Sequence, residues 1–116
     1  MGSTLETPIR HLAVSAYTVP TDLPESDGTY AWDSTTLVLV EVTAGDVQGL
    51  GYTYADTATA QLIKDQLAEV VLGCDAMAVP HAWAAMVAAI RNLGRPGIAS
   101  MAIAAVDAAL WDVKAR

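Results

Sequence analysis

The stretch GIASMAIAAVDAALWDVKAR, residues 97–116, decides the fold of this chain. It predicts a helix from about Ile98 to the last residue, in which apolar or small side chains fill more than one face. These side chains are Met101, Ile103, Ala104, Ala105, Val106, Ala108, Ala109, Leu110 and Trp111. A helix that is apolar all round needs cover on every side. We therefore expect this helix to be buried, and to need more cover than the short chain before it offers.

Two further helices are predicted before it. Asp56 or Thr57 can cap the first, which ends at Gly73. Its apolar positions recur at helical spacing, at Ile63, Leu67, Val70 and Val71. The second helix begins at Pro80, a residue well suited to a first turn. Its apolar stripe consists of Trp83, Met86, Val87 and Ile90. The Gly- and Pro-rich residues 92–97 then separate it from the last helix.

The first half of the chain predicts an antiparallel meander. Residues 9–18 alternate apolar and polar side chains, and residues 34–43 are rich in β-branched ones, so both predict strands. After a turn at residues 44–46, a third strand is expected at residues 47–54, where glycines indicate a bulge or a close backbone approach. Residues 19–33, with two prolines and four acids, predict a long loop. Three strands followed by three helices give an α+β fold.

Composition excludes several classes of function. The net charge is −7 and only six Lys and Arg residues are present, which argues against a nucleic-acid partner. The sequence contains no run of about 20 apolar residues, so no membrane span is predicted. No secretory signal is expected before the first strand. Cys74 is the only cysteine, so neither an internal disulfide nor a cysteine-based metal site is expected. We therefore expect the protein to be cytoplasmic.

Three segments, taken in order, resemble the N-terminal capping domain of the enolase superfamily, in its mandelate racemase and muconate lactonizing branch. They are VLVEVTAGDVQGLGY at residues 38–52, LGCDA at residues 72–76 and AAVDAALWDVKAR at residues 104–116. The resemblance implies that residues 1–97 form the capping domain, with its β-meander and two helices, and that residues 98–116 link it to a (β/α)₈ barrel. Such a barrel takes about 250 residues, and it is absent from these 116 residues.

The resemblance also implies an activity for a longer parent enzyme. In this family the barrel abstracts the proton next to a carboxylate, and a barrel-bound magnesium ion stabilises the enediolate. Acid-sugar dehydration or racemisation and epimerisation are the implied reactions, and cycloisomerisation stays open. No catalytic residue and no metal ligand is expected in the present chain, which alone should be inactive. Its implied partners are its own barrel, a small carboxylate substrate and further copies in a homo-oligomer.

Substrate contacts are implied where the family's cap folds over the barrel mouth, at residues 19–33 and 49–56. The substrate-binding candidates are Asp22, Tyr30, Trp32, Tyr52 and Tyr54. Each has a plainer alternative. The acids Asp22, Glu25, Asp27 and Asp33 fit a solvated acidic lid, and the aromatic residues fit ordinary packing.

Asp107 interrupts the apolar terminal helix and is expected to be structural, paired to backbone N–H groups or to a basic residue of the barrel. Asp112 is expected at an exposed or interdomain edge. An alternative function is a stand-alone interaction or dimerisation module that uses this helix. Exposure of Ala105, Ala109 and Trp111 would favour that alternative, because large apolar patches mark interfaces.

Overall fold

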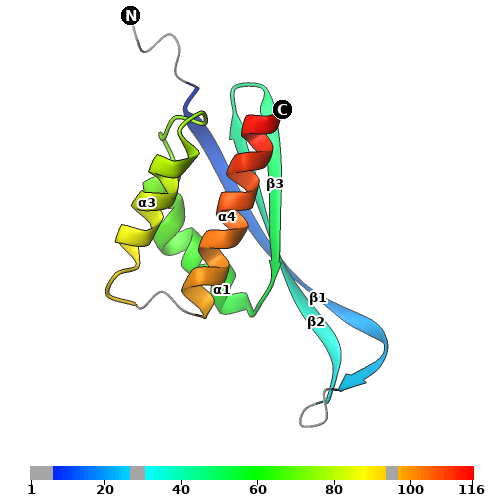
Figure 1. Cartoon of the computed structure of the whole chain (residues 1–116). Coiled ribbons are helices and arrows are strands. Elements are labelled where there is room, and N and C mark those ends of the chain that lie inside the picture. Colours follow the sequence, from blue (N-terminus) through cyan, green and yellow to red (C-terminus); the bar gives the residue numbers. More distant parts are fainter. Residues whose placement is uncertain (1–6, 27–30, 94–96) are drawn as a thin grey trace, which may run out of the picture.

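A computed structural model describes residues 7–26, 31–93 and 97–116 of the chain (Figure 1). The sheet consists of β1 (Ile9–Ser26), β2 (Ala31–Ala44) and β3 (Val47–Tyr54), paired antiparallel in the order β1-β2-β3. The helical elements are α1 (Thr57–Leu62), the π-helical η2 (Ile63–Leu67), α2 (Ala68–Val71), α3 (Val79–Ala89) and α4 (Ile98–Ala115). Because α1, η2 and α2 run on without a break, three strands are followed by three helices. The predicted α+β fold is confirmed.

The hydrophobic core lies between the helices and one face of the sheet. Val38, Val40 and Val42 alternate along β2 and are completely buried, as the two-residue period of a strand requires. The first helix contributes Ile63, Leu67 and Val71, α3 contributes Val79, Ala82, Met86 and Ile90, and α4 contributes the largest share of small and apolar side chains. All three helices therefore cover the same side of the sheet.

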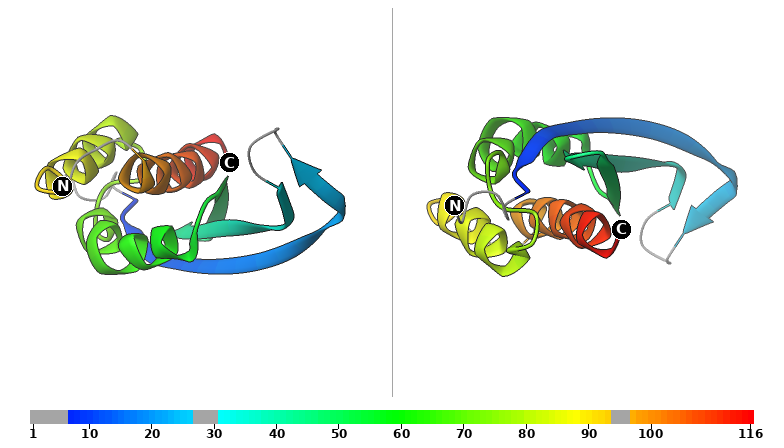
Figure 2. Two further views of the ribbon diagram at one scale, coloured as in Figure 1. Left: turned by 90° about the horizontal axis from the view of Figure 1, so that it is seen from below. Right: turned by 90° about the horizontal axis from the view of Figure 1, so that it is seen from above.

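Two glycines of β3 allow α4 to lie directly on the strand. A Cβ atom at Gly49 would stand 2.5 Å from the carbonyl oxygen of Ala109, and one at Gly51 would stand 2.2 Å from that of Ala105. Both positions are buried under the helix. Figure 2 shows the sheet curving around α4, which lies along β3. Of the two readings of these glycines, close backbone approach is confirmed.

The expected helix boundaries are reproduced closely. The side chain of Asp56 accepts a hydrogen bond from the backbone N–H of Ala58 and caps α1. Gly73, at a φ of +89°, ends the first helix. The segment 72–76 that follows it pairs with the start of β1, because the N–H of Ile9 donates to the carbonyl of Cys74 and the N–H of Gly73 donates to the carbonyl of Ile9.

The predicted stripe of α3 is wrong at one position. Trp83 is 38% exposed, whereas Met86 and Ile90 are buried. Ala82, one residue earlier, occupies the buried place instead. Ala82 belongs to the buried core cluster, and the large indole of Trp83 lies outside it. Apolar periodicity alone cannot distinguish these two faces.

The long loop predicted for residues 19–33 is also wrong. β1 continues to Ser26 and β2 begins at Ala31, so most of that segment is a two-stranded hairpin, which projects beyond the helices (Figure 1). The pairing shifts register between Pro20 and Glu25. An edge strand such as β1 tolerates proline where the nitrogen faces away from its neighbour, and Pro24 falls between Pro20 and Glu25, where the register shifts. The composition predicted a loop, but pairing with β2 overrides it.

The apolar surface of α4 is covered on one side only. Ala105 and Ala109 are fully buried, and β3 of the same chain covers them. Ile98, Met101 and Trp111 are between 38% and 46% exposed on the other side. The described chain thus covers only part of the helix, as the sequence led us to expect. Of the residues that would favour the interaction module, two face the chain's own sheet and only Trp111 faces outward.

Candidate functional site

Tyr52 and Tyr54 lie together on the side of the sheet opposite the helices. Both are exposed, by 61% and 63%. Their rings are 5.9 Å apart in an edge-to-face arrangement, which confirms that alternation along β3 places them on one face. The strand register adds Leu37, which is paired with Tyr54, and Leu39, which is paired with Tyr52. We call this surface the outer sheet face.

Tyr17 of β1 extends the outer sheet face and was not among the sequence candidates. It is paired with Leu37, which is itself paired with Tyr54, so the three residues form one row across the sheet. Tyr17 is 51% exposed. The register between β1 and β2 could have identified it, but residues 9–18 alone gave no reason to prefer one face. A tyrosine-rich surface of this kind offers both apolar area and hydroxyl donors.

The remaining substrate candidates are Asp22, Tyr30 and Trp32. Asp22 lies in β1 and Trp32 in β2, where the backbone of Trp32 is paired with that of Glu25. The structure describes their backbone but not their side chains. Tyr30 and Asp27 lie outside the described residues. Tyr52 and Tyr54 are therefore the two candidates whose side chains the structure brings together.

A second candidate site is a groove between α3 and α4. One hollow of about 180 Å³ is lined by Trp83, Val87, Ser100, Ile103, Ala104 and Asp107. An adjoining hollow of about 220 Å³ is lined by Val79, Pro80, Trp83, Asp107 and Trp111. Trp83 and Asp107 belong to both hollows. The carboxylate of Asp107 therefore shares the groove with two indoles, while Ser100 adds a second polar side chain to the first hollow.

Partial burial raises the pKa of Asp107, and a hydrogen bond with the side chain of Trp111 opposes that rise. Asp107 is half-buried at the groove, and Trp111 of the same helix is a hydrogen-bond partner that the sequence did not predict. The ammonium of Lys114 lies 5.0 Å from the centre of the Trp111 ring, a cation–π distance. One indole that lines the groove, that of Trp111, is thus already in contact with a cation of this chain.

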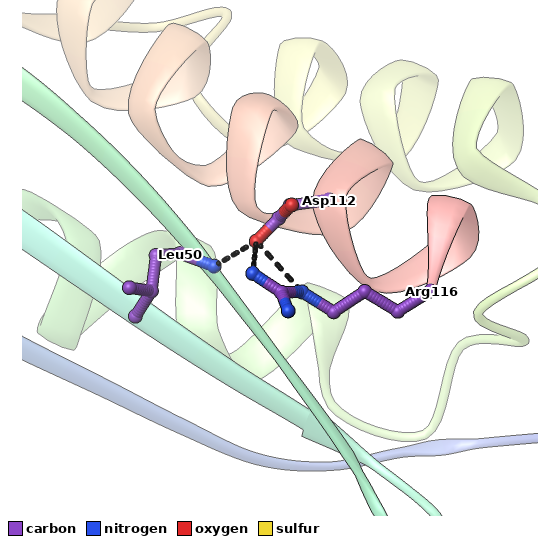
Figure 3. A network of polar contacts seen from close by, with 3 residues as sticks. All are labelled: Leu50, Asp112 and Arg116. Carbon is purple, nitrogen blue, oxygen red and sulfur yellow. Dashed lines mark hydrogen bonds and ion pairs between the residues drawn. The ribbon is translucent and has the colours of Figure 1, made fainter.

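Asp112 fastens the end of α4 to the free edge of the sheet (Figure 3). Its Oδ2 accepts a 2.8 Å hydrogen bond from the backbone N–H of Leu50 on β3. The same oxygen accepts hydrogen bonds from the guanidinium of Arg116, at 3.2 and 3.3 Å. The Leu50 N–H, followed by Arg116, holds the pKa of Asp112 below its usual range. The carboxylate thus satisfies an edge-strand donor that β2 cannot reach.

Within the described residues, no group of three or more His, Cys, Asp and Glu side chains lies close enough to hold a metal ion. His11 and His81 lie on different elements, β1 and α3. Cys74 donates a hydrogen bond from its thiol to the carbonyl of Val70. In the same part of the chain no helix is both long and apolar enough to cross a membrane.

Comparison with known proteins extends the match over nearly the whole chain. The family described as the N-terminal domain of mandelate racemase and muconate lactonizing enzyme matches residues 10–116. The 3,6-anhydro-alpha-L-galactonate cycloisomerase of Streptomyces coelicolor is 34% identical over 112 residues, which cover 91% of this chain and 31% of that protein. The L-talarate/galactarate dehydratase of Salmonella typhimurium is 31% identical over 84 residues, which cover 69% of this chain and 21% of that protein.

Solved structures show the same fold. A mandelate racemase/muconate lactonizing enzyme-like protein from Rubrobacter xylanophilus is 58% identical, with a TM-score of 0.92 over 94% of this chain and 30% of that one. A racemase from Streptomyces coelicolor with bound magnesium is 34% identical, with a TM-score of 0.88 over 91% of this chain and 31% of that one. The present chain thus spans about a third of its relatives' length. It belongs to the mandelate racemase and muconate lactonizing enzyme family of the enolase superfamily, as its N-terminal capping domain.

Proposed function

We propose that this domain caps the active site of a magnesium-dependent enzyme that abstracts the proton next to the carboxylate of an acid sugar. The observation that carries the proposal is the 34% identity, over 91% of the chain, to a cycloisomerase of an anhydro-galactonate. The similarity to an L-talarate/galactarate dehydratase points to the same hydroxyl-rich class of substrate. Acid-sugar dehydration is the reaction we favour, with racemisation, epimerisation and cycloisomerisation as the alternatives within this chemistry.

The cap would enclose the active site at the barrel mouth and contact the substrate. The hairpin of β1 and β2 projects beyond the helices, a shape suited to reaching over a barrel mouth (Figure 1). Excluding water there lowers the local dielectric and strengthens the attraction between a metal ion and a developing enediolate. We assign substrate contact to Asp22, Tyr30 and Trp32 around the hairpin, and to Tyr52 and Tyr54 on β3. The tyrosine hydroxyls suit the hydroxyl groups of a sugar acid.

The barrel would supply the catalytic base and the acidic ligands of the magnesium ion, since no such metal cluster occurs in the described residues. Magnesium, when bound there, would stabilise the negative charge of the enediolate. Residues 98–116 would link the cap, residues 1–97, to that barrel. The 116-residue chain alone should then be inactive, and the whole enzyme should be a homo-oligomer.

The test uses the full-length gene product. It is incubated with a panel of aldonic and aldaric acids, with magnesium or with EDTA, and turnover is followed by proton NMR in D₂O. We expect magnesium-dependent exchange of the proton next to the carboxylate with at least one acid sugar. A full-length protein without a barrel, or one that turns over no carboxylate with magnesium, would contradict the proposal.

Variants of the full-length protein test whether the cap contributes to substrate binding. Tyr54→Phe removes one hydroxyl from the outer sheet face, and we expect it to raise the KM for the acid sugar about tenfold by deleting a substrate hydrogen bond. Asp46→Asn, in the exposed turn between β2 and β3, is the control and should leave the KM unchanged. If Tyr54→Phe and Asp46→Asn behave alike, Tyr54 does not contact the substrate.

A further inference from the structure

The groove between α3 and α4 combines features that together suit a particular kind of ligand. Two tryptophans, Trp83 and Trp111, line it, each at least 38% exposed. Asp107 lines both hollows, hydrogen-bonds the side chain of Trp111, and is the one acidic residue among the side chains that line either hollow. Hollows of about 180 and 220 Å³ each exceed the roughly 30 Å³ that one water occupies in the liquid. The end of a long side chain therefore fits.

The charge in the groove favours a cation. Burial disfavours the ionised form of Asp107, so a positive partner brought into the groove recovers an electrostatic cost that the isolated domain bears. The Trp111 ring already has the ammonium of Lys114 at 5.0 Å, which shows that its surroundings accept a positive group. Among natural side chains, the planar guanidinium of arginine both stacks on indoles and pairs with a carboxylate.

We propose that the groove of Trp83, Asp107 and Trp111 is the socket for an arginine side chain from the barrel domain, and so helps to dock the cap on the barrel. The proposal rests on the proposed function for the existence of that barrel. Trp and Arg are the side chains that most often dominate the energy of an interface. A salt bridge enclosed by two indoles would be shielded from solvent and would fix the orientation of α4 relative to the barrel.

The first experiment needs only the 116-residue chain. Methylguanidinium chloride is titrated into labelled protein, and the indole N–H resonances of the tryptophans are followed by NMR, with sodium chloride at equal ionic strength as the blank. We expect saturable shifts for Trp83 and Trp111, with dissociation in the millimolar range. The variant Asp107→Asn should bind the probe about tenfold more weakly. Asp46→Asn removes the same charge from an exposed turn and should bind as the wild type does.

Asp107→Asn keeps an oxygen that can accept from Trp111, so circular dichroism should show an intact fold. Shifts that do not saturate, or equal binding by the Asp107→Asn variant, would overturn the socket. Either result would leave the proposed function untouched, since no barrel takes part in the titration.

A second experiment identifies the occupant. Carbodiimide with glycinamide modifies accessible carboxylates, and the rate at Asp107 relative to Asp46 is read by peptide mass spectrometry in the 116-residue chain and in the full-length protein. We expect the relative rate at Asp107 to fall about tenfold or more in the full-length protein, because the barrel covers the carboxylate. Equal relative rates in the two proteins would mean that the barrel does not occupy the groove, even where the enzyme is active.

Discussion

Replacing Gly51 by alanine is the sharpest test of how this fold is held together. In a strand interior, glycine is less favourable than alanine by roughly 0.5–1 kcal/mol, so backbone propensity predicts that Gly51→Ala stabilises the domain. The packing of α4 predicts the opposite. The new Cβ would stand 2.2 Å from the carbonyl oxygen of Ala105 and 2.6 Å from the backbone nitrogen of Ala109. Both atoms belong to the helix backbone and cannot rotate away.

The magnitude follows from the distance that α4 must move. A carbon and a carbonyl oxygen approach no closer than about 3.3 Å even in favourable contacts, so the helix must retreat by about 1 Å. A gap of that size forfeits roughly a quarter to a half of the dispersion energy across the contact. Overpacking typically costs about 1–3 kcal/mol, and the collision with helix backbone puts Gly51→Ala at the upper end. We expect a loss of about 3 kcal/mol from a domain stability of order 5–15 kcal/mol.

Urea denaturation followed by circular dichroism measures the free energy of unfolding. Gly73→Ala is the matched control, because the space around Gly73 is open and only its φ of +89° opposes a side chain. That strain alone costs roughly 1–2 kcal/mol, so Gly73→Ala should be the milder change. A Gly51→Ala protein as stable as the wild type, or more stable, would refute the close approach of α4 to β3.

Three further predictions concern polar groups. Asp112→Ala should lower stability at neutral pH by leaving the Leu50 N–H unpaired. Because folding lowers the pKa of Asp112, the difference in stability between wild type and variant should vanish as the pH falls through that lowered pKa. The pKa of Asp107 is raised by folding, so its ionisation costs stability as the pH rises from the unfolded to the folded pKa. Asp107→Asn should therefore be more stable than the wild type above that window and not below it, as thermal melts at pH 3 and pH 7 would show. Thr59→Val should raise stability by about 1 kcal/mol in urea denaturation, because the fully buried Thr59 hydroxyl has no hydrogen-bond partner among the described residues.

Local sequence signals predicted most of the fold. The Asp56 cap and the Gly73 end of the first helix are short-range features, and the structure reproduces both. The alternation of Val38, Val40 and Val42 likewise predicted which face of β2 is buried. Such signals act within a few residues, so they can be recognised without knowing what packs where.

The failures come from long-range contacts. The hairpin beyond Pro20 forms because residues of β1 find partners in β2, and no local pattern in a proline-rich, acidic segment reveals that pairing. Which side chain of α3 is buried, Ala82 or Trp83, depends on which face of the helix meets the rest of the core. The same limit applied to the candidate site, where Tyr17 joins the outer sheet face only through its register with Leu37.

Two of the segments that reveal the family are the two sides of a single contact. Gly49 and Gly51 come from the segment at residues 38–52, and they lie under Ala105 and Ala109 from the segment at residues 104–116. Asp112 of the second segment then fastens the helix to Leu50 of the first. These residues identify the family because they build the joint between sheet and helix. A joint of this kind is compatible with any substrate, so substrate choice must be sought in the exposed tyrosines, the hairpin and the barrel.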